Sequence, residues 1–287
     1  MIDRQEPVTT SLPEFFFPQD GSEIWLKAMD AELALLLLRL NVHLNQRVSP
    51  TRVLEIGVWR GAWSSVMLVN VADAVVYGVD PYPGYLSDIR GAMLQRLRDL
   101  GVEGRFVLSP DLSSLTAEKG FDMIHVDGEH SEAAVWSDLS FARNHLAPGG
   151  VIVVDDYRHP DFPGIASALF RFLETNNLRI FLVTPNKAYL ASPSDASSYH
   201  ESLLTNAPNL RHARLRRHFG EGDPEQDVYR QSSDVLGQPV LLAEKVSRSE
   251  HSNETTDSWL RRALRAITPP VFVDAYRFLR WGSSAKD

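Results

Sequence analysis

One pattern repeats from Arg52 to Ala191: a short apolar run that ends at a glycine or an aspartate, followed by a longer amphipathic segment. The clearest runs are residues 52–57 (RVLEIG), 74–79 (AVVYGV) and 121–126 (FDMIHV). Short runs with few polar residues are typical of strands that a parallel sheet buries on both faces. Because strands that alternate with helices form parallel sheets with right-handed crossovers, the pattern predicts an α/β fold with a doubly wound, mostly parallel sheet.

The flanking segments complete this prediction. Helices are expected at residues 62–71, 85–100, 132–145 and 165–175, and further strands at 105–108 and 151–154. Residues 179–184 and 187–191 flank Pro185-Asn186 and are expected to form an antiparallel pair. A preceding helix is expected at 22–41, and its nearly continuous apolar run at 33–38 predicts burial on most sides.

The length of the chain and its composition shifts suggest one core with appendages. We divide it into an N-terminal arm and helix (1–50), a central domain (51–195), an accessory segment that completes or covers the sheet (196–246), and a linker with amphipathic helices (247–287). Residues 192–198 are expected to form turns. The C-terminal helices carry arginines among apolar residues, which is typical of a docking surface in a homodimer or of weak peripheral membrane contact.

The charge balance and the cysteine count exclude several classes of protein. A formal net charge of −8 argues against a nucleic-acid-binding protein, which needs a basic face for phosphates. The chain has no cysteine, so disulfides, thiolate zinc sites and cysteine nucleophiles are excluded. The N-terminus lacks a signal-peptide pattern, and the apolar stretch near it is too short to span a bilayer, so we expect a soluble, cytoplasmic protein.

The turn after the first predicted strand is a candidate cofactor site. Gly57 and Gly61 allow a tight bend that a ligand approaches closely, and ligands of parallel sheets bind beyond the carboxyl ends of the strands. Glu55 would repel a diphosphate but suits a cationic sulfonium. Because the third glycine of the dinucleotide fingerprint is also missing, the turn favours S-adenosylmethionine over NAD. The alternative for Glu55 is a core carboxylate paired with an arginine.

Two further residues near this turn are candidate cofactor contacts. Asp80 follows the second strand and precedes Pro81, where a carboxylate accepts both ribose hydroxyls. Its alternative role is to initiate a turn. Ser64 is placed to bond the cofactor carboxylate or, equally, to cap the helix that follows.

Three carboxylates are predicted to meet at one edge of the sheet. Asp127 ends the fourth strand, Asp155 and Asp156 end the fifth, and adjacent strands lie about 5 Å apart. Unpaired, these carboxylates would repel one another, and a hard divalent ion such as Mg²⁺ removes that conflict. The alternative is that some of them cap the following helices or turns.

Two histidines are candidate general bases. His130 follows Asp127 by three residues, and a neutral imidazole beside a metal can accept the proton of a bound hydroxyl. The alternative roles of His130 are to cap the next helix or to contact an adenine. His159, on the loop after the fifth strand, is a second candidate base.

Taken together, four segments resemble the class I methyltransferases: V-L-E-I-G-x-x-x-G-x-x-S, G-V-D-P, F-D-M-I-H-V-D-G-x-H and L-x-P-G-G-V-I-V-V-D-D-Y. More narrowly, they are similar to the metal-dependent group that includes catechol O-methyltransferase and the macrolide-sugar and glycan methyltransferases. The resemblance covers roughly residues 22–192. It implies a seven-stranded Rossmann-like sheet with a reversed last strand, a catalytic domain at 51–195 that binds S-adenosylmethionine, and a metal held by Asp127, Asp155 and Asp156.

The resemblance also implies the reaction. It predicts Mg²⁺-assisted methyl transfer to a hydroxyl of a sugar, glycan or glycosylated natural product, because His130 stands where the sugar enzymes have histidine and the catechol enzymes lysine. The long segment after Ser192 favours the same branch. Asp111 matches a position that contacts adenine. The predicted cofactor-binding residues are Glu55, Gly57, Val58, Trp59, Gly61, Ser64, Asp80, Pro81, Asp111 and Asp127.

Several other functions fit parts of the sequence. A catechol-type enzyme for small molecules shares the predicted metal site. An NAD-dependent oxidoreductase shares the sheet but requires a third glycine and no acidic residue in the turn. A non-catalytic scaffold would tolerate loss of the carboxylates and of His130, yet all are present. A relative of the cephalosporin-hydroxylase-like group shares the same motifs.

The acidic turn generates a prediction about ligand choice. Calorimetric titration should show that S-adenosylhomocysteine binds and that NAD does not, because Glu55 opposes a diphosphate. Repeating the titration in EDTA tests whether cofactor binding needs a metal. Tight NAD binding would contradict the choice of cofactor.

Overall fold

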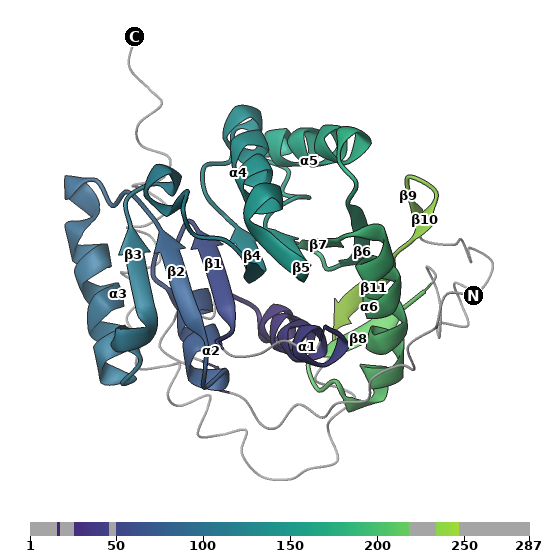
Figure 1. Ribbon diagram of the computed structural model, residues 1–287, viewed down its shortest axis with the longest axis horizontal. Helices are drawn as coiled ribbons and strands as arrows, with labels where there is room; N and C mark the ends of the chain where they lie inside the picture. Colours follow the sequence, from purple (N-terminus) through teal and green to yellow (C-terminus); the bar gives the residue numbers. More distant parts are fainter. Residues whose placement is uncertain (1–15, 18–25, 46–49, 218–233, 247–287) are drawn as a thin grey trace, which may run out of the picture. The chain divides into compact units, whose positions relative to one another are not determined.

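The computed structural model describes residues 16–17, 26–45, 50–217 and 234–246 (Figure 1). All of these residues belong to one compact unit. The predicted linker and amphipathic helices at 247–287, and most of the N-terminal arm, lie outside the described residues. Phe16 of the arm is described, and its backbone N–H donates to the Oδ1 atom of Asn70 at 2.7 Å.

A nine-stranded sheet forms the centre of this unit, in the order β3-β2-β1-β4-β5-β7-β6-β11-β8 (Figure 1). Its strands are β1 (Arg52–Ile56), β2 (Val75–Val79), β3 (Phe106–Ser109), β4 (Phe121–Val126), β5 (Leu146–Val154), β6 (Arg179–Val183), β7 (Ala188–Ala191), β8 (Ala213–Arg216) and β11 (Leu241–Lys245). Two short strands, β9 (Asp234–Val235) and β10 (Gln238–Pro239), form a separate antiparallel hairpin.

The sheet is parallel from β3 to β5, and β7 runs antiparallel to both β5 and β6. Because β1 pairs with β2 on one side and β4 on the other, the chain reverses its winding direction there, and such a switch point opens a crevice beyond the strand ends. The α/β, Rossmann-like fold is as predicted.

The expected count of seven strands is wrong, because two later segments extend the sheet. β11 pairs in parallel with β6, and β8 pairs antiparallel with β11. Leu241 and Ala243 of β11 are buried, whereas Leu242 and Glu244 are only partly buried. β11 thus points one row of side chains into the core, while its backbone pairs with the edge of β6 that would otherwise be open.

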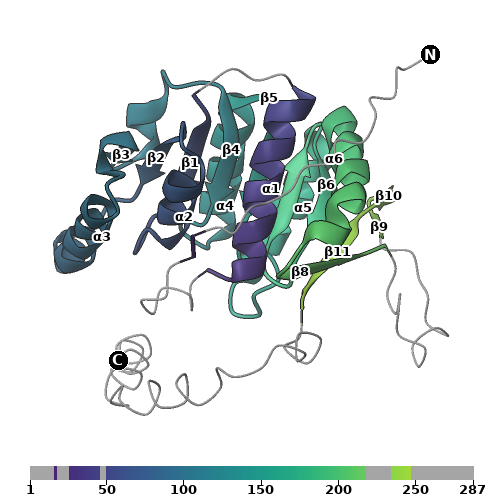
Figure 2. The same ribbon diagram turned by 90° about the horizontal axis from the view of Figure 1, so that it is seen from below.

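Helices cover both faces of the sheet. They are α1 (Ala28–Leu44), α2 (Ala62–Asn70), α3 (Ser87–Asp99), α4 (Glu132–His145), α5 (Pro163–Thr175) and α6 (Pro193–Asn206). One core packs α1, α2, α3 and α6 on one face, and a second packs α4 and α5 on the other. Figure 2 shows α1 lying between α2 and α6. No helix within the described ranges combines the length and apolar character that crossing a membrane requires.

The central helix α1 is buried on nearly every side, as predicted. It begins at Ala28 and ends at Leu44. The predicted helix at 22–41 therefore ended too early, and the described residues 26 and 27 precede the helix. Its Glu32 is also buried and accepts hydrogen bonds from the backbone N–H groups of Arg211, His212 and Ala213 at 2.7, 2.8 and 3.0 Å. Three donors compensate a buried carboxylate and fix the start of β8 against α1.

The turns predicted at residues 192–198 are instead the first part of α6. Ser192 caps this helix, because its hydroxyl accepts from the backbone N–H of Asp195, and Pro193 occupies the first helical position. The buried Tyr199 then stacks on Phe181 and donates its hydroxyl to the carbonyl of Gly149 at 2.5 Å. Serine and proline signal a helix start as well as a turn, which explains the error.

The burial of Glu32 generates a stability prediction. Glu32→Gln should lower the free energy of unfolding by about 2 kcal/mol, because a neutral amide replaces charged acceptors facing three N–H donors. Urea denaturation measures the change. The exposed Glu103, which pairs with Arg98 at the surface, provides the control Glu103→Gln, expected within about 0.5 kcal/mol of the parent. Equal effects of the two substitutions would contradict the prediction.

Candidate functional site

Acidic residues gather where β1, β2, β4 and β5 end. Because these parallel strands are neighbours, their carboxyl ends lie at one edge of the sheet. Ligand atoms of His125, Asp127 and Asp155 lie within 4.8 Å of one another, as do those of Asp127, His130 and Asp156. The three aspartates predicted to meet therefore do so, in two groups that share Asp127.

The turn after β1 has the conformation that its glycines predict. Gly57, Trp59 and Gly61 have positive φ angles of 86°, 50° and 66°. Packing also requires glycine at two of these positions. A Cβ atom on Gly57 would lie 1.9 Å from the carbonyl oxygen of Asp127, and one on Gly61 would lie 2.7 Å from the Cγ atom of Met93. Gly57 therefore packs against the Asp127 backbone and Gly61 against the Met93 side chain, and approach of a ligand to this turn stays a prediction.

Asp80 connects the turn after β1 with the turn after β2. Its Oδ2 atom accepts from the N–H of Trp59 at 2.9 Å, and its Oδ1 atom accepts from the N–H of Tyr82 at 3.0 Å. The Tyr82 hydroxyl donates to the carbonyl of Trp59. Asp80 thus performs the alternative, turn-forming role, yet its half-buried carboxylate retains acceptor capacity for a ligand. Neighbouring Pro81 is exposed.

Glu55 and Ser64, two of the predicted cofactor contacts, bond to each other inside the protein. Both side chains are buried, and the Ser64 hydroxyl donates to the Glu55 carboxylate. No side chain caps α2, which excludes that role for Ser64. The basic group near Glu55 is His125, whose Nδ1 atom lies 3.7 Å from the Glu55 carboxylate, rather than the arginine of the alternative interpretation. Val58 is likewise buried in the core, so only its backbone reaches the turn.

Asp111 caps a short helix at Leu112–Leu115. Its carboxylate accepts from the Ser113 hydroxyl and from the Ser114 N–H at 3.1 Å. These bonds, the Ser113 bond first, lower the pKa of this exposed carboxyl. Its contact with an adenine stays a prediction.

A buried cation lies behind the carboxylates. Lys187, whose side chain is 3% exposed, forms an ion pair with the Oδ2 atom of Asp155. Its Nζ atom also lies 2.9 Å from the Nε2 atom of His125. The Oδ1 atom of Asp155 accepts from the N–H of Asp156 at 2.8 Å. Burial alone would raise the pKa of Asp155, but Lys187 and His125 hold that pKa well below its usual value.

The second group is more open, and the charge of Lys187 has only a minor influence on it. The side chain of Asp127 is 32% exposed, and its Oδ1 atom lies 3.6 Å from the Nε2 atom of His130. Burial and the charge of Asp155 raise the pKa of Asp127 to about 6, and the same two causes raise the pKa of Asp156. Asp156 also has a left-handed φ of 52°, a strained conformation that is concentrated at functional sites.

Both candidate bases contact Phe162. The ring centroids of His130 and His159 lie 4.2 and 4.7 Å from that of Phe162. The Asp127 carboxylate, 3.6 Å away, raises the pKa of His130. Ser131 caps α4, so the capping role considered for His130 is wrong. The Nδ1 atom of His159 accepts from the N–H of Asp161 at 3.2 Å, which turns that ring toward its own loop.

Sequence reasoning missed two residues of this site, His125 and Lys187. Both lie in or beside strands that are mostly apolar, and a polar side chain in such a strand is the available signal. Lys187 directly precedes β7. His125 belongs to β4, and its ring stacks on Trp63 of α2.

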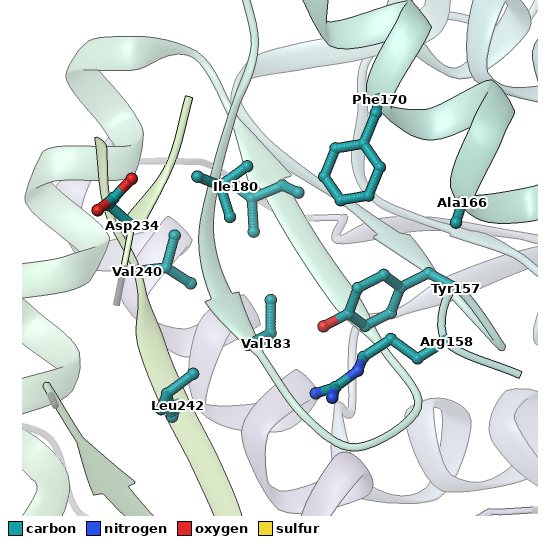
Figure 3. A pocket seen from close by; sticks show the side chains of 10 residues that line it. Tyr157, Arg158, Ala166, Phe170, Ile180, Val183, Asp234, Val240 and Leu242 are labelled. Carbon is teal, nitrogen blue, oxygen red and sulfur yellow. The ribbon is translucent and has the colours of Figure 1, made fainter. Parts of the chain in front are cut away.

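A pocket of about 440 Å³ is lined by residues of α5, β6 and β11 (Figure 3). Tyr157 and Arg158, which directly follow Asp156, line one side, and Phe170 of α5 lies above them (Figure 3). Val183 of β6 and Leu242 of β11 contribute apolar walls. The pocket is therefore apolar, with few polar groups.

Residues 54–157 match a family model described as a methyltransferase domain. This segment holds most of β1, all of β2 to β5 and the acidic residues of the site, so this part of the chain is similar to methyltransferase domains. No curated protein sequence matches the chain.

Solved structures similar to this chain include three O-methyltransferases. The O-methyltransferase NovP is 18% identical, with a TM-score of 0.44 over 57% of this chain and 80% of that one. A putative O-methyltransferase from Klebsiella pneumoniae is 22% identical, with a TM-score of 0.45 over 61% and 83%. CalS11, a TDP-rhamnose 3'-O-methyltransferase of calicheamicin biosynthesis, is 19% identical, with a TM-score of 0.41 over 59% and 83%.

The raised pKa of Asp127 generates a prediction about pH. Because the folded chain binds this proton more tightly than the unfolded chain, the ionised carboxylate costs stability above a pH of about 6, and the cost disappears as the pH falls toward 4. In EDTA, Asp127→Asn should raise the free energy of unfolding at about pH 8 and lose this advantage toward about pH 4.

Urea denaturation across this pH range measures the difference. Asp161→Asn, at an exposed carboxylate of the loop after β5, is the matched control and should show no such trend. A constant difference for Asp127→Asn would contradict the prediction.

Proposed function

We propose that this protein transfers a methyl group from S-adenosylmethionine to a hydroxyl of a sugar, a glycan or a glycosylated natural product, with help from a divalent ion and a histidine base. One observation carries the proposal. Within a methyltransferase domain, Asp127, His130 and Asp156 converge at the sheet edge where the β1 turn and Asp80 also lie.

The cofactor would be held by the turn at residues 57–61 and by Asp80. Two backbone N–H groups fix the carboxylate of Asp80, so its remaining lone pairs are oriented before ribose hydroxyls arrive. The buried Glu55 places a negative charge beneath the turn, which suits a cationic ligand. When bound, the cofactor supplies an electrophilic methyl group on a sulfonium.

A divalent ion fits the open group of ligands. Asp127 and Asp156 are partly exposed carboxylates with raised pKa values, so their negative charge lacks a sufficient partner within the described residues. Hard divalent cations bind such oxygens, and the ion would lower the pKa of an acceptor hydroxyl. The two aspartates would hold the ion beside the histidine.

His130 is the proposed base. Its imidazole lies against Phe162 and beside Asp127, so the ring is held at the site in a defined orientation. In the neutral form it would accept the proton that the acceptor hydroxyl loses during transfer. Alignment of the hydroxyl with the methyl group supplies much of the remaining rate, because the displacement is in line.

The body of the acceptor is proposed to bind in the pocket beside α5. One of its lining residues, Tyr157, directly follows Asp156 in the chain. Its walls are largely aliphatic and aromatic, with Arg158 as a cation at one side (Figure 3). An apolar lining favours the aglycone of a glycosylated natural product over a bare glycan.

The proposed base is tested by kinetics with radiolabelled S-adenosylmethionine and a panel of glycosylated natural products. His130→Gln should lower kcat by about 10²- to 10⁴-fold, because proton removal is lost, while affinity for S-adenosylhomocysteine stays unchanged. Product mass spectrometry locates the methyl group on oxygen.

Two variants complete this assay. His159→Gln should retain kcat within a few-fold, since His159 faces its own loop. Phe170→Ala, in the pocket wall, should raise KM for the acceptor and leave kcat nearly unchanged. An unaltered kcat for His130→Gln would disprove its role as base, and absence of methyl transfer to any hydroxyl would disprove the proposed activity.

A further inference from the structure

The pocket lined by α5, β6 and β11 has an uneven distribution of charge. Most of its lining is aliphatic or aromatic, and its charged side chains are Arg158 and Asp234. Figure 3 shows Arg158 beside Tyr157 at one side of the pocket and Asp234 at the opposite side. A ligand that fills the pocket therefore meets a cation at one end, an anion at the other and apolar walls between them.

The guanidinium of Arg158 is available to a ligand. This residue is exposed, and no carboxylate in the described part of the chain forms an ion pair with it. The neighbouring Tyr157 is buried, and burial raises the pKa of its phenol although the charge of Arg158 opposes the change. The phenol therefore keeps its proton, so both side chains present hydrogen-bond donors at the same side of the pocket.

The first turn of α5 adds positive potential to this side. The helix begins at Pro163 with neither a capping side chain nor an acidic residue in its first turn, so that turn does not neutralise the positive end of the helix dipole. Ala166, in the same turn, lines the pocket together with Tyr157 and Arg158. The side chain of Asp161, two residues before the helix, is 71% exposed, and water screens its charge.

This arrangement selects a ligand that is both apolar and anionic. The planar donors of a guanidinium match the two oxygens of a carboxylate, and the apolar walls reduce the competition from water. The volume of about 440 Å³ suits a small organic molecule rather than a chain of sugars. The reverse orientation is disfavoured, because it would bring the carboxylate to Asp234.

We propose that the acceptor is a glycosylated natural product whose aglycone carries a carboxylate, which Arg158 and the Tyr157 hydroxyl bind. The inference rests on the proposed function in taking this pocket as the acceptor site. Both residues directly follow Asp156, so the loop that leaves the acidic edge of the sheet also anchors the acceptor. Arg158 then determines which acceptors bind and takes no part in methyl transfer itself.

Fluorescence titration of the full chain with naphthoate and with its neutral amide, naphthamide, tests the proposal without turnover. The two probes share an apolar body and differ in charge. Naphthoate should bind about tenfold more tightly, because a hydrogen bond to a charged group contributes more than one to a neutral group. Added NaCl should reduce this preference. Equal affinities, or no binding of either probe, overturn the proposal.

Three variants locate the preference. Arg158→Gln should weaken naphthoate binding about tenfold and leave naphthamide binding unchanged. Arg171→Gln removes an α5 arginine that pairs with Glu132 outside the pocket lining, and both affinities should stay within about twofold of the parent values. Asp234→Asn should not weaken naphthoate binding, since it removes a negative charge from the opposite side. A preference that survives Arg158→Gln, or weaker naphthoate binding to Asp234→Asn, overturns the proposal.

Kinetics separate this inference from the proposed function. For a methylated acceptor that carries a carboxylate, Arg158→Gln should raise KM about tenfold with kcat nearly unchanged, and KM for the matching neutral amide should not change. Methyl transfer with equal KM values for acid and amide would reject the inference alone. Arg158-dependent binding of naphthoate without transfer to any hydroxyl would reject the proposed function and leave the anion-selective pocket standing.

Discussion

The ion pair of Lys187 and Asp155 is the interaction on which the arrangement of the site depends. It joins the start of β7 to the end of β5, two strands that run in opposite directions. Lys187 also reaches His125 of β4, which approaches Glu55 of β1. Three strands of the sheet and the reversed β7 are thus connected through one chain of buried polar groups.

Around this buried chain, the turns of the sheet edge are fixed by short-range contacts. Asp80 holds the turns after β1 and β2 together, and Gly57 lets the Asp127 backbone approach closely. Three non-glycine residues with positive φ angles, Trp59, Tyr82 and Asp156, lie in these turns. Such strain persists only where the surrounding structure imposes it, so the edge is pre-formed rather than assembled by a ligand.

Much of the fold could be predicted, because contiguous residues carry the signals for strands and helices, and the parallel topology then brings Asp127, Asp155 and Asp156 to one edge. The error at α6 arose because Ser192-Pro193 signals a helix cap as well as a turn. The sequence indicated that residues 196–246 complete or cover the sheet, but the strand partners of β11 and β8, and the pairing of Lys187 with Asp155, could not be predicted. Both join segments distant in the sequence, and packing alone selects the partner.

The extension of the sheet by two strands also changes what its border presents to other molecules. Without β11 and β8, the border would be β6, whose residues from Ile180 to Val183 are apolar and buried. The border is instead β8, where Arg214 and Arg216 alternate with Ala213 and Leu215. Charged side chains on a terminal strand, here including the ion pair of Arg216 with Glu244, oppose edge-to-edge stacking into fibrils, so the added strands protect the protein against aggregation at this border.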